Sequence, residues 1–140
     1  MKKLLTLIFI LLLALSACQS AKPVESVTGS LVEVAGGSYL NVTPPELKSM
    51  LANKDFVFVN VHIPFAGNIA NTDLSIPYDQ IEQNLPQLPA DKNAKIVLYC
   101  RSGRMSEMAA ETLVKLGYTN LWNLDGGTAA WQLAGYEIQK

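Results

Sequence analysis

The order of apolar and polar residues along the chain predicts strands that alternate with helices. β-Branched, aromatic and other apolar residues dominate 56–61 and 95–100, which is typical of buried strands, and shorter apolar runs at 31–34, 39–42 and 121–124 predict three more. The run at 31–34 is the expected edge strand. A chain that alternates strands and helices at these intervals is expected to form an α/β fold, with a mainly parallel central sheet and helices on both faces.

Helices are predicted where apolar residues recur at spacings of three and four. Thr43 is the expected N-cap of a first helix, because prolines follow it and Glu46 stands where it would close a capping box. A longer helix is expected over 104–116, with Gly117 at its C-terminal end, and another after the glycine pair at 126–127. The predicted buried stripe of the longer helix consists of Met105, Met108, Ala109, Thr112, Leu113 and Leu116.

Residues 1–17 have the composition of a secretory signal peptide. Two lysines precede an uncharged apolar run from Leu4 to Leu15, which is shorter than the roughly 20 residues that span a membrane. Leu-Ser-Ala-Cys at 15–18 resembles the lipobox of bacterial lipoproteins, in which the cysteine is lipidated and becomes the first mature residue. We therefore expect a lipid anchor on Cys18. A plain secretory signal with an incidental cysteine is the alternative.

The expected domain organisation follows from this N-terminus. Residues 18–37 comprise Cys18, a polar tether and the short edge strand, and residues 38–140 form one domain. The protein is then expected in the cell envelope, anchored to a membrane by lipid and facing the periplasm or the exterior. Without the two lysines of residues 1–17, nine basic side chains remain against 12 acidic ones, so a nucleic acid is not an expected partner.

Cys100 is the one thiol left when Cys18 is assigned to the lipid. A leftover cysteine in an exported protein indicates a reactive group or an intermolecular disulfide, although an inert buried thiol is also common. Cys100 ends the predicted strand 95–100 directly before a helix, at the sheet edge where ligands of α/β proteins bind. Its surroundings favour the thiolate form. A Ser-Gly pair lets the backbone curl so that N–H groups point inward, and the helix N-terminus, Arg101 and Arg104 add positive charge.

Three segments resemble the rhodanese-like sulfurtransferases. Cys-Arg-Ser-Gly-Arg-Met-Ser at 100–106 is similar to the active-site loop of that family, and Leu-Asp-Gly-Gly-Thr-Ala-Ala-Trp at 124–131 is similar to its closing segment. Thr-Pro-Pro-Glu-Leu at 43–47 resembles its opening helix. The similarity covers about residues 38–139, and the loop together with the Gly-Gly-x-x-x-Trp segment is its most specific part.

This resemblance implies sulfur transfer in two steps. Cys100 would take the outer sulfur of a small anionic donor such as thiosulfate, hold it as a persulfide, and pass it to a thiol or a cyanide-like acceptor. The loop amides would stabilise the anionic persulfide. The expected substrate-binding residues are Arg101, Ser102, Gly103, Arg104, Met105 and Ser106. No cofactor is expected, whereas a reducing partner protein is, because a lone thiolate outside the cytoplasm must be kept reduced or persulfidated.

Several of these assignments have ordinary structural alternatives. The two arginines could be a solvated pair, Ser102 and Ser106 could be capping residues, and the spacing of Met105 favours the core. The first strong strand commonly ends Asp-Val-Arg in the family but ends Asn60-Val61-His62 here, and 68–72 replaces the usual Gly-His-Ile-Pro stretch. His62, the only histidine, could assist Cys100 or be structural, and one histidine with one free cysteine gives no metal site.

Other functions compete with sulfur transfer. A non-enzymatic module of the same fold would bind a partner or carry a persulfide without rapid turnover. A Cys-x5-Arg phosphatase is disfavoured, because its arginine would fall at Ser106. A thiol–disulfide oxidoreductase lacks a second cysteine after Cys100.

Overall fold

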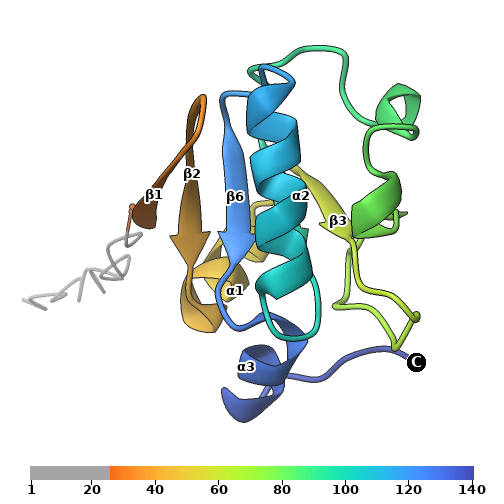
Figure 1. Ribbon diagram of the computed structural model, residues 1–140. Helices are drawn as coiled ribbons and strands as arrows, with labels where there is room; N and C mark the ends of the chain where they lie inside the picture. Colours follow the sequence, from red (N-terminus) through yellow and green to blue (C-terminus); the bar gives the residue numbers. More distant parts are fainter. Residues whose placement is uncertain (1–25) are drawn as a thin grey trace, which may run out of the picture.

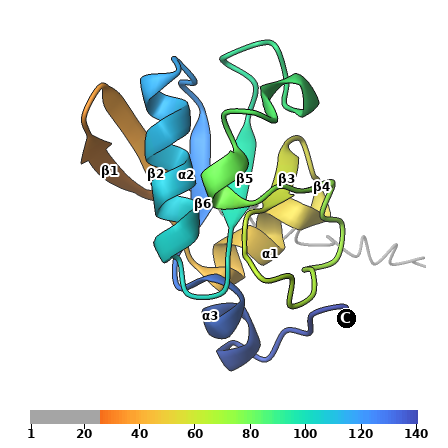
Figure 2. The ribbon, with the colours of Figure 1, turned by 45° about the vertical axis from the view of Figure 1, so that its right-hand side comes forward.

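The computed structural model describes residues 26–140, so the predicted signal peptide and Cys18 lie outside the described residues. The described chain forms a six-stranded sheet with the order β1-β2-β6-β5-β3-β4, whose six strands are labelled in Figure 2 (Figures 1 and 2). β1 and β2 pair antiparallel, and the other neighbouring strands pair parallel, which confirms the predicted mainly parallel sheet. The strands are β1 (Ser30–Val34), β2 (Gly37–Val42), β3 (Val57–Asn60), β4 (Leu74–Ser75), β5 (Ile96–Tyr99) and β6 (Leu121–Leu124).

Helices cover both faces of this sheet (Figures 1 and 2). The helices are α1 (Pro44–Ala52), α2 (Arg104–Lys115) and α3 (Gly127–Leu133), with two short 3-10 turns, η1 (Tyr78–Gln80) and η2 (Leu85–Gln87). Along β5, Ile96 and Leu98 belong to a core that includes buried residues of α2, here called the α2-side core. Val97 and Tyr99 belong to a second core with Leu47 of α1, the α1-side core. The alternation along β5 therefore places Cys100 on the α2 side.

The predicted start of α1 is confirmed in detail. The backbone N–H of Glu46 donates to the Thr43 hydroxyl oxygen, with 3.4 Å between nitrogen and oxygen. The backbone N–H of Thr43 donates in turn to the Glu46 carboxylate over 2.7 Å, which completes the capping box. The capping box satisfies two N–H groups that would otherwise lack partners.

The predicted buried stripe of α2 is wrong in part. Met108 is 47% exposed, and Met105, Thr112 and Leu116 are only half-buried. The buried residues of α2 are Ser106, Ala109, Ala110, Leu113 and Val114. This set also recurs at spacings of three and four, but it turns small residues toward the sheet, so that the helix and the sheet can approach closely.

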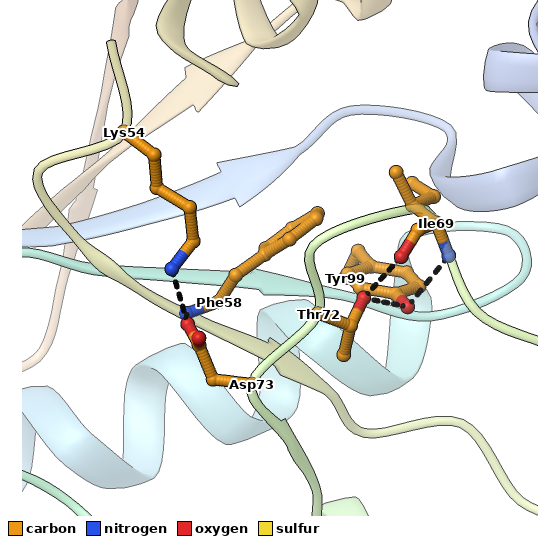
Figure 3. A network of polar contacts seen from close by, with 6 residues as sticks. All are labelled: Lys54, Phe58, Ile69, Thr72, Asp73 and Tyr99. Atoms are coloured by element: carbon orange, nitrogen blue, oxygen red, sulfur yellow. Dashed lines mark hydrogen bonds and ion pairs between the residues drawn. The ribbon is translucent and has the colours of Figure 1, made fainter. Parts of the chain in front are cut away.

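Tyr99 fixes the long loop between β3 and β4 from the side of the sheet opposite to Cys100. Its hydroxyl accepts the backbone N–H of Ile69 over 3.0 Å and lies 2.8 Å from the Thr72 hydroxyl (Figure 3). Asp73 holds the end of the loop, because its carboxylate accepts from the Phe58 backbone N–H over 2.7 Å. Among residues 26–140, no helix is long and apolar enough to cross a membrane.

Candidate active site

Cys100 directly follows β5, and its sulfur lies at the base of a tight turn. The Sγ atom accepts the backbone N–H of Gly103, with 3.1 Å between nitrogen and sulfur. The Ser106 hydroxyl lies 3.5 Å from Sγ and 2.8 Å from the Gly103 carbonyl oxygen. That hydroxyl has one proton, so it donates to one of the two at a time. The side chain of Cys100 also packs in the α2-side core and is only 1% exposed, so the sulfur is recessed beneath its loop.

Gly103 allows the chain to turn from β5 into α2. Its φ of 98° lies in the region that favours glycine, and it serves as the N-cap of the helix without a capping side chain. The first helical hydrogen bond runs from the Glu107 N–H to the Gly103 carbonyl over 2.9 Å. The N–H groups of the first turn, 104–106, therefore have no carbonyl acceptor within α2. They are the backbone donors available to an anion held next to the sulfur.

The N-terminus of α3 holds this turn in place. The N–H groups of Thr128 and Ala129 each donate over 2.9 Å, to the carbonyls of Cys100 and Arg101 respectively. Gly127 makes this approach feasible, because a Cβ there would meet the Cys100 carbonyl oxygen and come within 2.7 Å of the Arg101 carbonyl oxygen. The two most specific segments of the sequence therefore form one structural unit around the sulfur.

The remaining loop residues divide between solvent and core. Arg101, Ser102 and Arg104 are exposed. Within the described chain, the ion pairs are Lys54–Asp73 and Lys95–Asp55, so neither guanidinium is neutralised by an ion pair there. Two positive charges thus flank the N-terminus of α2, where the helix dipole is also positive.

The other two predicted loop positions lie toward the core. Met105 is half-buried against the α2-side core, and Ser106 is fully buried. The Ser106 hydroxyl faces Gly103 and Cys100, as described above, so it supports the shape of the turn from below.

His62 lies beside the loop because β3 and β5 are parallel neighbours. Asn60 is in register with Tyr99, and the Val61 N–H donates to the Tyr99 carbonyl over 2.9 Å, so His62 reaches the level of Arg101. The pKa of His62 is lowered from 6.5, first by burial and second by the positive charge of Arg101. At neutral pH the imidazole is therefore uncharged.

Sequence reasoning missed Asn60, whose side chain is buried at the end of β3. Its amide donates to the Gly67 carbonyl over 3.0 Å and to the Asn68 side-chain oxygen over 2.9 Å, and its own oxygen accepts from the His62 N–H over 2.9 Å. An aspartate at this position could not replace both bonds, because an ionised carboxylate donates none and a protonated carboxyl donates only one. A polar residue at the end of an otherwise apolar strand was the available signal.

Among residues 26–140 no three histidine, cysteine or carboxylate side chains lie close enough together to hold a metal ion. Cys100 is a free cysteine within this part of the chain. The described site brings together a thiol, backbone donors and two arginines.

Known proteins resemble this chain in sequence and in fold. The family model of the rhodanese-like domain matches residues 43–134. The tRNA uridine(34) hydroxylase of Erwinia tasmaniensis is 33% identical over 97 residues, which cover 65% of this chain and 27% of that protein. The chain thus spans only a minor part of the curated relatives that it matches.

Two solved structures extend the comparison. The rhodanese-like domain protein from Staphylococcus aureus superposes with a TM-score of 0.58 at 32% identity, over 71% of this chain and 98% of that one. An NAD-dependent persulfide reductase from A. fulgidus superposes with a TM-score of 0.50 at 27% identity, over 56% of this chain and 14% of that one. On the family match and this shared architecture, the chain belongs to the rhodanese-like domain family.

Proposed function

We propose that this protein is a sulfurtransferase that moves sulfane sulfur through a persulfide on Cys100. The observation that supports this most directly is the hydrogen bond from the Gly103 N–H to Sγ at 3.1 Å, formed where a parallel strand meets the N-terminus of α2. A backbone donor aimed at the sulfur stabilises negative charge there without any side-chain rearrangement. The N–H groups of 104–106, which have no acceptor within α2, add further backbone donors at the same helix start.

The reaction balances without a cofactor. The Cys100 thiolate attacks the outer sulfur of thiosulfate, the sulfur–sulfur bond of the donor breaks, and sulfite leaves with the bonding electron pair. Cys100 then carries an anionic persulfide. Cyanide or a thiolate attacks its outer sulfur, and the electron pair of the persulfide bond returns to Sγ, which regenerates the starting thiolate.

The burial of Cys100 limits which donors can react. Its side chain is only 1% exposed, so the reacting sulfur of the donor must be a terminal atom on a slender group that can enter between the loop residues. Exposed Arg101 and Arg104 would hold the charged end of that donor outside. These features together favour a small anion such as thiosulfate.

The cellular setting is part of the proposal. We propose, on the lipobox-like segment that ends at Cys18, that the domain is tethered by lipid to a membrane of the cell envelope and faces the periplasm or the exterior. A reducing protein would keep Cys100 usable there, and the likeness of the fold to part of a persulfide reductase supports a partner of this kind. The acidic excess of the chain argues against a tRNA substrate, despite the similarity to part of a tRNA hydroxylase.

The alternative is a module that carries a persulfide without rapid turnover, or that only binds a partner. The recessed position of Sγ favours this second candidate, because the donor must reach that buried atom and the acceptor must reach the sulfur attached to it.

Intact-mass spectrometry of the purified protein after incubation with thiosulfate tests the proposal. We expect the mass to increase by one sulfur atom, and cyanide to remove that atom and release thiocyanate. Cys100→Ser is the matched control, which should gain no mass. An unchanged mass of the wild-type protein would refute sulfur transfer, and stable sulfur uptake without thiocyanate release would support the carrier.

A further inference from the structure

The imidazole of His62 has two nitrogen atoms in different surroundings. Nδ1 is buried and has no hydrogen-bond partner among the described residues. Nε2 has no protein partner there either, but it is not among the buried atoms. The ring therefore has one nitrogen enclosed by protein and one that is not fully buried.

This arrangement selects one neutral tautomer. A proton on Nδ1 would be a buried donor without an acceptor, which costs free energy. An unprotonated Nδ1 is a buried acceptor without a donor, and this costs less. Protonating both nitrogens would incur the same penalty and would also add a second cation beside Arg101. The favoured state is an uncharged ring with its proton on Nε2, directed away from the core.

The backbone of His62 is held in place next to the Cys100 loop. The His62 N–H donates to the Asn60 side-chain oxygen, and the Asn60 amide is itself anchored to Gly67 and Asn68. Asn60 is only 2% exposed. The pairing of β3 with β5 sets His62 at the level of Arg101, immediately after Cys100.

We propose that His62 binds the anionic end of the sulfur donor, donating a hydrogen bond from Nε2 to one of its oxygens beside Arg101. This inference rests on the proposed function, since it assigns a substrate contact in the same site. It assigns His62 the role of a specificity residue for oxygen-bearing sulfur donors such as thiosulfate. Arg101 supplies long-range attraction, and the neutral donor adds direction without further charge.

Two amide substitutions separate a donor at Nε2 from a structural role. The side-chain nitrogen of glutamine can occupy the place of Nε2, whereas that of asparagine corresponds to Nδ1 and is too short to reach outward. The affinity for thiosulfate is measured by calorimetry with Cys100→Ser as the parent protein, so that no sulfur is transferred. His62→Gln, His62→Asn and His62→Ala are then added singly.

We expect His62→Ala and His62→Asn to weaken thiosulfate binding about tenfold, the effect of losing one hydrogen bond to a charged group, and His62→Gln to stay within about twofold of the parent. In proteins that retain Cys100, the same substitutions should raise KM for thiosulfate in the thiocyanate assay and leave kcat nearly unchanged. Urea unfolding of each variant shows whether it is folded.

Three results would overturn the role of His62. The folded variants could all bind thiosulfate with equal affinity, or glutamine could weaken the affinity as much as alanine does. The parent protein could also fail to bind thiosulfate at all. Failure of the proposed function gives a different result. In that case the wild-type protein gains no sulfur, while thiosulfate still binds to the parent and still depends on residue 62. The two failures are therefore distinguishable.

Discussion

The substitution Gly127→Ala tests whether the contact between α3 and the Cys100 turn holds the site together. Gly127 has a φ of 59°, and a Cβ at this position would come within 2.6 Å of the Arg101 carbonyl carbon and 2.7 Å of its oxygen. These are backbone atoms, so no side chain can rotate away to relieve the overlap. Either α3 or the turn at 100–103 must move.

The expected loss of stability follows from these contacts. A left-handed conformation disfavours alanine relative to glycine by about 1–2 kcal/mol. Displacing α3 also breaks the hydrogen bonds from the Thr128 and Ala129 N–H groups, each worth about 0.5–1.5 kcal/mol. The sum of these ranges is about 2–5 kcal/mol, a large fraction of the total stability of a typical small domain.

Gly135→Ala is the matched control. Gly135 also has a positive φ, of 87°, but a Cβ there would have no heavy atom within 4 Å. It should therefore show only the conformational penalty of about 1–2 kcal/mol. Urea unfolding gives both free energies, and alkylation of Cys100 by iodoacetamide under native conditions reports the shape of the turn.

We expect Gly127→Ala to lose more stability than Gly135→Ala and to change the alkylation rate of Cys100, whereas the control should keep the wild-type rate. If the two variants are equally stable and Cys100 reacts at the same rate in both, then α3 does not hold the turn and the reasoning fails.

Three further predictions concern the fold around the site. Thr43→Val removes the capping hydroxyl of α1 and should lower the free energy of unfolding by about 1 kcal/mol, measured in urea; no change would mean that the capping box is unimportant. Tyr99→Phe leaves the buried N–H of Ile69 without its acceptor, so we expect a loss of about 1–3 kcal/mol in the same assay, and a neutral result would count against this network. The lowered pKa of His62 predicts a pH effect, because the folded protein binds the proton less readily than the unfolded chain does. The free energy of unfolding should therefore be highest above pH 6.5 and should fall as the pH drops from 6.5 through the lower pKa of the folded state. Wild type should therefore lose more stability than His62→Gln on acidification over this range, and parallel losses would contradict the assignment.

The sequence predicted those features that depend on neighbouring residues. The capping box at Thr43 needs only Glu46 three positions later, and the turn after Cys100 needs a glycine that can adopt a positive φ. Apolar runs of four to six residues likewise identified each long strand of the parallel sheet.

The features that the sequence did not predict depend on contacts between distant segments. In α2 two stripes have helical spacing, and hydrophobicity alone favours the one that contains Met108. The structure buries the other stripe, because the turn after Cys100 sets the rotation of the helix and directs Ser106 inward. A polar residue at the end of an apolar strand marks Asn60 as unusual, but the sequence does not identify the acceptors of its amide nitrogen, since these lie seven and eight residues further along a loop.

The hydrogen bonds from α3 to the carbonyls of Cys100 and Arg101 have a consequence for protein engineering. Grafting the heptapeptide 100–106 alone onto another α/β scaffold would transfer the nucleophile without the hydrogen bonds from α3 that hold its turn in shape. A successful transplant should include the second peptide, 124–131, at the same relative position. Conversely, the side chains of Arg101, Ser102 and Arg104 are exposed and take no part in these backbone hydrogen bonds, so the three positions are the natural choice for randomisation in a library that seeks new donors.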